Sequence, residues 1–344
     1  MRIRGIACSM PSRRVSNEEV IELVRQASAP LLSPAQMGRV VARMRSLFRL
    51  SGSKYRRHRS EGELARDFAL RAATEALERA ELSPSDIDLL IYVGVGRGWV
   101  EPGMANYFAD ALGLRNATCF DLLDACLSWM RALHVAHHFL RNDVYRNIMV
   151  LNAEFNWPEY LKCAIKDPDE LEYRFAQFTI GESATATILS KGRGAVEPHF
   201  EFKTDASLHT LCKIPLPHIA QYSDAELCPS LEPLVFFAYS TELFRAARRM
   251  ITDCYTGSPE LRRRPFDIVF THSASKSLAT QLDRGLGGNG RTVDLFEEFG
   301  NTVSASIPLA MCWAIEHGRL TRGMRMLHVV GSAGFSVGLA HMVY

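Results

Sequence analysis

The sequence predicts an α/β fold made of two duplicated halves, because strand patterns repeat at one constant spacing. A buried strand around Asp88 is repeated around Asp267, and a second buried strand around Val150 is repeated around Val329. Both pairs are 179 residues apart. Buried strands resemble one another, so a single pair can arise by chance, but one shared spacing favours duplication.

A helix precedes the first of these strands in each half. Apolar residues recur at helical spacing over residues 64–80 and again over residues 236–254. Strands that alternate with helices are typical of parallel βαβ units. We therefore expect one α/β half over residues 1–190 and a second half over residues 191–344.

Composition limits the classes of protein that the chain fits. The 344 residues are 47% hydrophobic and 23% charged, with a net charge of +2, which gives no general argument for nucleic-acid binding. Eight cysteines without a CxxC pair favour free thiols over a disulfide framework or a structural zinc site. The chain start lacks the apolar stretch of a secretory leader, and no segment reads as a membrane span, so we expect a cytoplasmic protein.

Cys126 stands where a predicted helix begins, because apolar residues recur behind it at helical spacing as far as Leu140. Backbone N–H groups and the positive end of a helix dipole lower the pKa of a thiol, which favours the reactive thiolate. The alternative is an ordinary buried cysteine, which is the usual role and the one expected of the other seven.

His272 and Asn301 occupy two further junctions. His272 ends a buried strand, and ligand sites form at the ends of parallel strands in open α/β sheets. Asn301 lies in a Gly-Asn-Thr turn, near the point that matches Cys126 in the other half. Taken singly, they read as a structural histidine and a turn or helix-capping asparagine. Together with Cys126 they supply a thiol, an imidazole and a carboxamide, a set that can accept an acyl group and stabilise negative charge on a second thioester.

In chain order, these three segments resemble the ketoacyl synthase III-like branch of the thiolase superfamily. The resemblance covers nearly the whole chain, because three further segments are similar to those of this family: Leu50–Arg57, Ile180–Leu189 and the glycine-rich Gly331–Gly338. It implies a thiolase-like five-layer αβαβα fold and a homodimer. It also implies substrates carried on coenzyme A or on the phosphopantetheine of an acyl carrier protein, with no other cofactor.

The resemblance assigns the catalytic roles to Cys126, His272 and Asn301, and the oxyanion hole to the backbone N–H groups of Cys126 and Ala333. The implied reaction is a Claisen condensation. Cys126 takes an acyl group, and a second thioester held by His272 and Asn301 attacks that group to form a carbon–carbon bond. The alternative is an acyltransferase that moves the acyl group to an alcohol, amine or thiol. Asn301 argues against the alternative, because an enolate needs two donors more than simple transfer does.

The chain departs from the family pattern at several positions, which favours specialised fatty-acid or polyketide-type metabolism over housekeeping fatty-acid initiation. Larger residues follow the cysteine, Ser275 replaces an asparagine, and Glu182 stands in the segment that usually reads Gly-Asp-Gly. Two other classes of protein are disfavoured. A papain-like cysteine hydrolase conflicts with the repeated α/β halves, and a non-catalytic partner subunit conflicts with the intact reactive set.

Two further sets of charged residues are candidates. Glu101 aligns with a segment that, in the family, crosses the dimer interface, so it is a possible base for the partner's site; the alternative is a solvated glutamate. Five arginines are expected to contact anionic coenzyme A or carrier protein, with a solvated surface as the alternative: Arg49, Arg56, Arg57, Arg248 and Arg249.

Three histidines follow Cys126 on its predicted helix. His134 and His138 form an i, i+4 pair that is able to bind a metal, but the Glu of an HExxH motif is missing. We favour packing for His134, His137 and His138 and expect no metal site.

Overall fold

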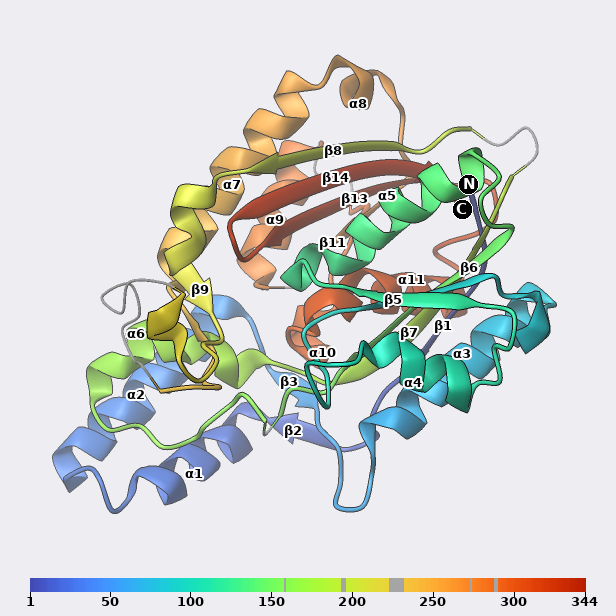
Figure 1. The fold of residues 1–344 in the computed structure, drawn as a ribbon. Coiled ribbons are helices and arrows are strands. Elements are labelled where there is room, and N and C mark those ends of the chain that lie inside the picture. The colour runs from blue at the N-terminus through green and yellow to red at the C-terminus, as the bar shows by residue number, and fades with distance from the viewer. Residues whose placement is uncertain (158, 193–195, 223–231, 273, 288–289) are drawn as a thin grey trace.

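A computed structural model describes residues 1–157, 159–192, 196–222, 232–272, 274–287 and 290–344. Within these residues, two five-stranded sheets form the centre of the molecule (Figure 1). The strand order of the first sheet is β1 (Arg2–Ser9), β7 (Ser183–Ser190), β6 (Asn147–Glu154), β4 (Leu89–Val93) and β5 (Thr118–Leu122). Strands β6, β4 and β5 are parallel, whereas β7 runs antiparallel to both β6 and β1.

The second sheet repeats this arrangement strand for strand. Its order is β8 (His199–Thr204), β14 (Ser336–Val343), β13 (Arg325–Ser332), β11 (Ile268–Thr271) and β12 (Thr292–Val293). Strands β13, β11 and β12 are parallel, and β14 runs antiparallel to both β13 and β8. The predicted duplication is confirmed, because order and direction agree throughout and β4 and β6 match β11 and β13. The boundary after residue 190 stays a prediction.

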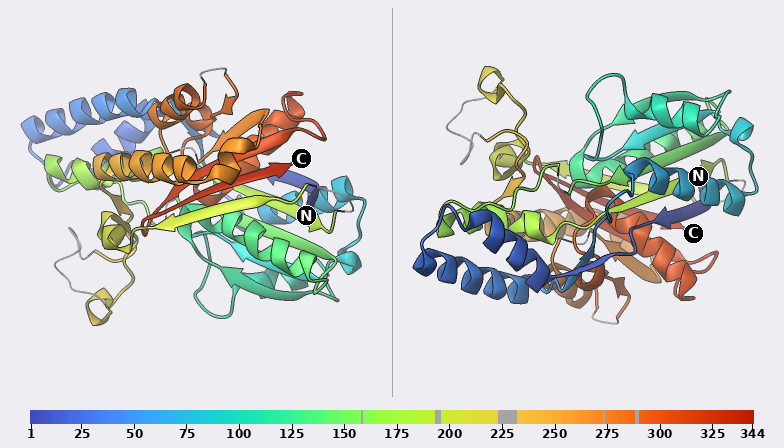
Figure 2. Two further views of the ribbon diagram at one scale, coloured as in Figure 1. Left: turned by 90° about the horizontal axis from the view of Figure 1, so that it is seen from above. Right: turned by 90° about the horizontal axis from the view of Figure 1, so that it is seen from below.

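Helices fill three layers around the two sheets (Figures 1 and 2). Between the sheets lie α5 (Ser128–Arg141) and α11 (Ser306–Glu316), whose apolar side chains form one core with strands of both sheets. The outer face of the first sheet is covered by α3 (Ala65–Ala80) and α4 (Met104–Ala111). The outer face of the second is covered by α7 (Ser240–Gly257) and α9 (Lys276–Gly285). The result is the expected five-layer αβαβα fold.

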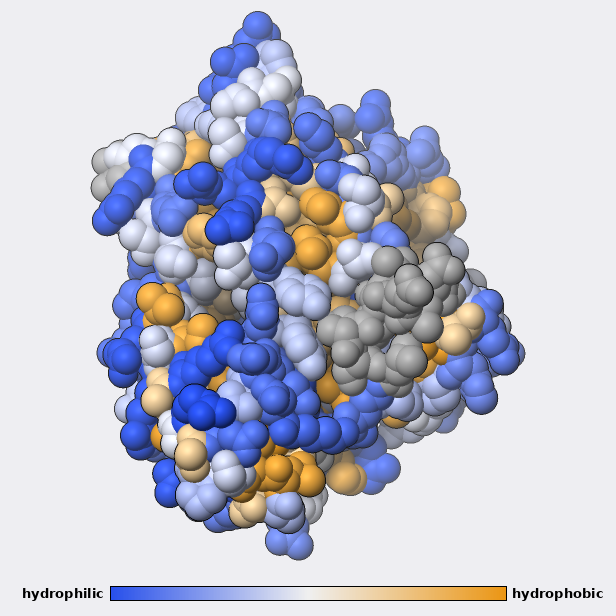
Figure 3. All heavy atoms as spheres, turned by 90° about the vertical axis from the view of Figure 1, so that its left-hand side faces the viewer, coloured by the Kyte–Doolittle hydropathy of each residue, from blue (hydrophilic) through white to orange (hydrophobic). Residues whose placement is uncertain are grey.

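A smaller helical unit packs at one end of these layers. It has its own apolar cluster and consists of α1 (Asn17–Ser28), α2 (Pro34–Ser51) and α6 (Leu171–Arg174). Next to it lies the short antiparallel pair of β2 (Arg14–Ser16) and β3 (Tyr55–Arg57). Ser16 and Ser33 begin α1 and α2 with capping boxes, which satisfy the first free N–H groups of each helix. Seen from this side, the surface is mainly hydrophilic with small apolar patches (Figure 3).

The remaining short elements connect these layers. They are β9 (Cys212–Lys213), β10 (Phe237–Ala238), α8 (Pro259–Arg263) and α10 (Phe296–Phe299). In the described part of the chain, no helix has both the length and the apolar character that crossing a membrane requires.

Candidate active site

Each half contains the same tight turn where its central helix begins. Ala125 opens the 3₁₀ turn before α5 with a φ of 45°, and Val303 opens the 3₁₀ turn before α11 with a φ of 50°. Positive φ is uncommon for residues other than glycine, so two matched cases indicate a shared structural requirement. The following residues, Cys126 and Ser304, therefore occupy equivalent positions.

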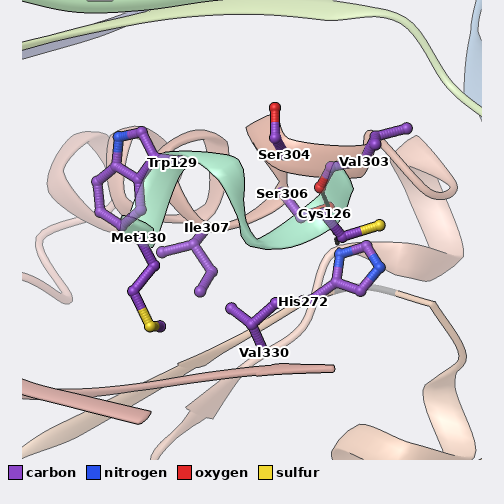
Figure 4. A pocket seen from close by; sticks show the side chains of 9 residues that line it. All are labelled: Cys126, Trp129, Met130, His272, Val303, Ser304, Ser306, Ile307 and Val330. Carbon is purple, nitrogen blue, oxygen red and sulfur yellow. Dashed lines mark hydrogen bonds between the residues drawn. The ribbon is translucent and has the colours of Figure 1, made fainter. Parts of the chain in front are cut away.

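Cys126 and His272 line the same hollow between the halves (Figure 4). The hollow holds about 180 Å³ of space between atoms, part of it open to solvent, and is too narrow for a water molecule to fit. In Figure 4 the Cys126 sulfur and the His272 ring lie on the same side of it, at the start of α5. Its other lining residues come from α5, from the turn and first residues of α11, and from β13: Trp129, Met130, Val303, Ser304, Ser306, Ile307 and Val330.

His272 is held in a fixed orientation directly after β11. Its backbone N–H bonds the Val329 carbonyl at 3.0 Å, and its Nδ1 lies 3.1 Å from Ser306 Oγ. Burial lowers the pKa of His272 to about 4, against a weaker opposing effect from the Val303 carbonyl. The imidazole is therefore neutral at physiological pH and able to accept a proton.

The Cys126 thiol has the opposite shift from the one expected from the sequence. Burial raises its pKa well above the usual range, and the neighbouring Cys212 and Glu154 act in the same direction. A hydrogen bond from the Cys126 backbone favours the thiolate but does not offset burial. The prediction that the helix start alone lowers this pKa is wrong, so the thiol needs a base. His272 lies on the wall of the same hollow in its neutral form and is the candidate for that role, although its lowered pKa makes it a weak base.

Asn301 is fixed beside the hollow rather than on its wall. Its backbone N–H bonds the Thr179 carbonyl at 2.8 Å, its carbonyl accepts from Gly181 N–H at 3.0 Å, and its Oδ1 accepts from Val303 N–H at 2.8 Å. The side-chain oxygen thus has a hydrogen-bond donor, whereas the Nδ2 group donates to no acceptor among the described residues. Asn301 itself does not line the hollow; it is bound to a lining residue, Val303, which lies two residues further on.

Glu154 is a buried carboxylate at the end of β6 that sequence reasoning missed. It accepts hydrogen bonds from Val95 N–H at 3.2 Å, Gly96 N–H at 3.0 Å, Asn156 Nδ2 at 3.0 Å and Ser304 Oγ at 2.5 Å. These bonds join the segment after β4, the end of β6 and the turn that contains Ser304. The available signal was an acidic residue inside an apolar strand, since buried carboxylates need partners.

Ser332 connects the β13–β14 hairpin to the Cys126 turn. Its Oγ accepts from Leu127 N–H at 3.2 Å and donates to the Asp124 carbonyl at 3.0 Å. Ala333, the predicted second oxyanion donor, follows Ser332 at the tip of that hairpin. Its role stays a prediction.

Glu101 is exposed in the segment between β4 and α4. Glu101 is not among the residues that line the hollow of its own chain, so it has no role at that site. A function as base depends on the site of a second chain and stays a prediction.

Arg56 is not available to a carrier or to coenzyme A, which corrects one expectation. Its side chain is completely buried and bonds Val15 O at 3.4 Å, Asn17 Oδ1 at 2.8 Å and Ser53 Oγ at 3.0 Å. Burial lowers its pKa to about 10. An arginine in a basic run is normally read as surface, but this one lies on a strand that packs inwards.

The other four arginines differ in exposure. Arg57 is partly buried and bonds Glu298 at 3.0 Å. Arg49 on α2, and Arg248 and Arg249 on α7, are exposed. Binding of an anionic partner by these residues stays a prediction.

A duplicated five-layer fold with a cysteine at the start of a central helix and a histidine beside it defines the thiolase-like class of enzymes. Two family models match within this frame: 3-oxoacyl-[acyl-carrier-protein] synthase III over residues 120–206, and the C-terminal part of the same family over residues 259–344. The chain therefore belongs to the ketoacyl synthase III-like family of condensing enzymes.

Comparison with individual proteins agrees with this assignment. The β-ketoacyl-[acyl-carrier-protein] synthase III of Helicobacter pylori strain J99 is 26% identical over 99% of this chain and 97% of its own length. The enzyme of that name from Aliarcobacter butzleri is 28% identical over 84% of this chain and 86% of its own. A solved structure of Xanthomonas campestris OleA, with lauric acid and lauroyl-CoA bound, has a TM-score of 0.81 at 19% identity, with 99% and 98% of the two chains covered.

Proposed function

We propose that this protein joins two thioester substrates by Claisen condensation in specialised fatty-acid or polyketide-type metabolism. The observation that carries the proposal is the placement of Cys126 and His272 on one hollow between the duplicated halves. A half-buried thiol and a neutral, buried imidazole form a nucleophile and its base.

The first half-reaction loads an acyl group onto Cys126. His272 Nε2 takes the thiol proton as the sulfur attacks the thioester carbonyl carbon. The oxyanion of the tetrahedral intermediate accepts hydrogen bonds from the backbone N–H groups of Cys126 and Ala333. Collapse of this intermediate expels the carrier thiolate, which takes the proton back from His272.

The second half-reaction forms the carbon–carbon bond. The carbonyl of the second thioester binds Asn301 Nδ2 and His272 Nε2 while its α-carbon loses a proton or carbon dioxide. The resulting enolate attacks the acyl carbonyl, and Cys126 leaves as a thiolate. Glu101 of the partner subunit is the proposed base when a proton is lost rather than carbon dioxide.

The OleA structures support a role for a glutamate. OleA has been solved as variants of a glutamate, a cysteine and a histidine that follow one another in this order along the chain. Glu101, Cys126 and His272 follow the same order here. The proposed homodimer brings Glu101 to the neighbouring site, as the resemblance implies for this segment.

The proposed substrates are carried on coenzyme A or on an acyl carrier protein. The curated relatives are named for acyl carrier protein, and one OleA structure contains lauroyl-CoA. Both carriers are anionic, and the exposed Arg49, Arg248 and Arg249 suit such a partner.

Intact-protein mass spectrometry after incubation with acyl thioesters of different length tests the first half-reaction. We expect an adduct of one acyl group on the wild type and on Cys254→Ala, a control at a half-buried cysteine of α7, and none on Cys126→Ala. Equal adducts on all three proteins contradict the proposal.

Product mass after addition of labelled malonyl or acyl thioester tests the second half-reaction. A β-keto product supports condensation. Transfer of the loaded acyl group to an alcohol, amine or thiol, without a new carbon–carbon bond, identifies the acyltransferase alternative instead.

A further inference from the structure

His134 and His138 lie one turn apart on α5 and meet through their ring nitrogens. The two Nε2 atoms are 3.1 Å apart. His138 is exposed and His134 is half-buried, whereas His137 is buried with its ring near Phe200. Packing, the role favoured from the sequence, therefore describes His137 and the ring of His134, which lies against Phe200 and Phe202, but it does not account for the exposed His138.

The short distance limits the protons that the pair can hold. A neutral imidazole has one donor and one acceptor nitrogen, and two Nε2–H groups pointing at each other repel. At 3.1 Å, at most one of the two facing nitrogens carries a proton. The other directs a lone pair at it. When both rings carry their proton on Nδ1, both facing nitrogens offer lone pairs, which is the state that a bound cation requires.

The distance also fits a shared metal ion. Imidazole nitrogens bind Zn²⁺ at about 2.05 Å, so two ligands of one ion are about 2.9 Å apart at a right angle and about 3.3 Å apart at the tetrahedral angle. The observed 3.1 Å lies between these limits. We propose that His134 and His138 chelate one divalent ion of the imidazole-binding type, such as Zn²⁺ or Ni²⁺, through their Nε2 atoms.

Neighbouring side chains hold the His134 ring in place for this purpose. The rings of Phe200 and Phe202 on β8 lie 5.0 and 5.2 Å from it, measured between centroids. Preorganisation of this kind lowers the entropic cost of chelation. The nearby positive charge of Arg131 opposes a cation, but Arg131 is paired with Asp124 at 2.9 Å.

Solvent supplies the remaining ligands. Among the residues that the structure describes, no group of three or more His, Cys, Asp or Glu side chains is placed to hold a metal. Two imidazoles and water select zinc or nickel over magnesium, which prefers oxygen ligands. The ion would fasten two successive turns of the helix that begins beside Cys126.

Equilibrium dialysis of the purified protein against Ni²⁺, Zn²⁺ or Mg²⁺ alone tests the site. Cysteine thiols also bind these ions. The number of ions bound per chain is therefore compared between proteins that have the same number of cysteines. We expect wild type to bind one more Ni²⁺ or Zn²⁺ per chain than His134→Gln or His138→Gln, and we expect no difference with Mg²⁺. Loss of either imidazole removes the chelate and weakens binding on the order of 10²-fold.

His317→Gln is the matched control, because His317 is an exposed histidine near the end of α11. It should bind the same number of ions as wild type. Circular dichroism without metal verifies that all variants are folded. Equal Ni²⁺ binding by wild type, His134→Gln and His138→Gln overturns the proposal, as does a loss that His317→Gln shares.

Discussion

At the residue scale, the chemistry depends on which nitrogen of His272 carries its proton. Ser306 Oγ lies 2.9 Å from the Val303 carbonyl and 3.1 Å from His272 Nδ1. When the hydroxyl donates to Val303, Nδ1–H donates to Ser306 and Nε2 is free to act as a base. When the hydroxyl donates to Nδ1, Nε2 carries the proton and acts as a donor. The two proposed half-reactions need these two states in turn, so Ser306 is a positioning residue.

Substitution of Ser306 by Ala should slow turnover without removing substrate binding. The alanine variant lacks the hydroxyl that accepts from Nδ1–H in one state and donates to Nδ1 in the other, so we expect kcat to fall on the order of 10²-fold with little change in KM. Ser306→Thr retains the hydroxyl and should restore most of the rate. Steady-state kinetics of the three proteins measures this split, and an alanine variant as fast as wild type refutes the role.

The pKa of His272 predicts how acylation of Cys126 depends on pH. The base must be neutral, and burial lowers its pKa to about 4. The single-turnover acylation rate should therefore stay within about twofold between pH 7.5 and pH 5.5, because the imidazole remains mostly unprotonated there. A histidine with the usual pKa near 6.5 would lose about tenfold over the same interval. Rapid-quench mass spectrometry of the acyl-enzyme distinguishes these outcomes.

At the element scale, Glu154 fixes the turn before α11 to the rest of the site. It accepts from Ser304 N–H at 3.3 Å and from Ser304 Oγ, while Val95 and Gly96 bind the same carboxylate from the segment after β4. The same 3₁₀ turn begins at Val303, which holds Asn301 Oδ1. A fully buried side chain of one half thus sets the position of the asparagine in the other half.

Glu154→Gln should separate the two half-reactions. The amide NH₂ of glutamine has to face backbone N–H donors, so the turn shifts and the free energy of unfolding falls by about 1–3 kcal/mol. We expect acyl loading on Cys126 to persist while condensation drops on the order of 10²-fold, because Asn301 loses its position.

Glu182→Gln is the matched control. Glu182 is also buried, but it bonds Arg59 rather than the Ser304 turn. Loading and condensation are measured separately for each variant. A Glu154→Gln enzyme in which both rates fall equally contradicts the assignment.

Features that depend on neighbouring residues were predictable from the sequence. Features that depend on contacts between distant segments were not. The repeated strands and the helix after Cys126 follow from periodicity and spacing, which depend on neighbouring residues only. The burial of Arg56 and the partners of Glu154 depend on segments far apart in the chain. The pKa of Cys126 was predicted in the wrong direction, because a helix start is visible in a sequence whereas the depth of burial is not.

At the scale of the whole molecule, the duplication leaves β5 as an edge of the first sheet. Apolar side chains on and near it are exposed, including Phe120 at 36%, Leu123 at 60% and Val100 at 74%. Exposed edge strands with apolar side chains are typical sites of strand pairing between chains. The proposed homodimer uses this edge and places Glu101 beside the second site.

Leu123→Asp should therefore weaken association. A charge on this edge lowers the affinity if two chains pair there, because it is removed from water. It has no such effect if the edge faces solvent. We expect sedimentation velocity to show a dimer for wild type and a shift towards monomer for the variant, with an unchanged circular dichroism spectrum. A wild-type monomer at micromolar concentration excludes this arrangement.

Several buried histidines make the whole molecule sensitive to acid. Burial lowers the pKa of His58 and His272 to about 4 and that of His328 to about 3, whereas the usual value is 6.5. Above pH 6.5 both the folded and the unfolded chain leave these rings neutral. As the pH falls from 6.5 towards 4, these histidines bind protons in the unfolded chain but stay neutral in the folded chain. The folded state therefore loses stability in that window. Glu182 acts in the opposite direction, because burial raises its pKa to about 7 and it costs stability as pH rises above its usual 4.5.

Burial also lowers the pKa of His137 to about 4, so four histidine protons against the one of Glu182 predict a net loss of stability as pH falls through this window. Each unmatched proton changes the unfolding free energy by up to about 1.4 kcal/mol per pH unit. Urea unfolding at pH 7.5, 6.5 and 5.5 should show the loss below 6.5. His328→Leu should reduce its slope by about one proton and raise stability at pH 7.5, because both ring nitrogens of His328 lack hydrogen-bond partners among the described residues. The exposed His317→Gln should leave the slope unchanged, and equal slopes in all three proteins would show that His328 titrates normally in the fold.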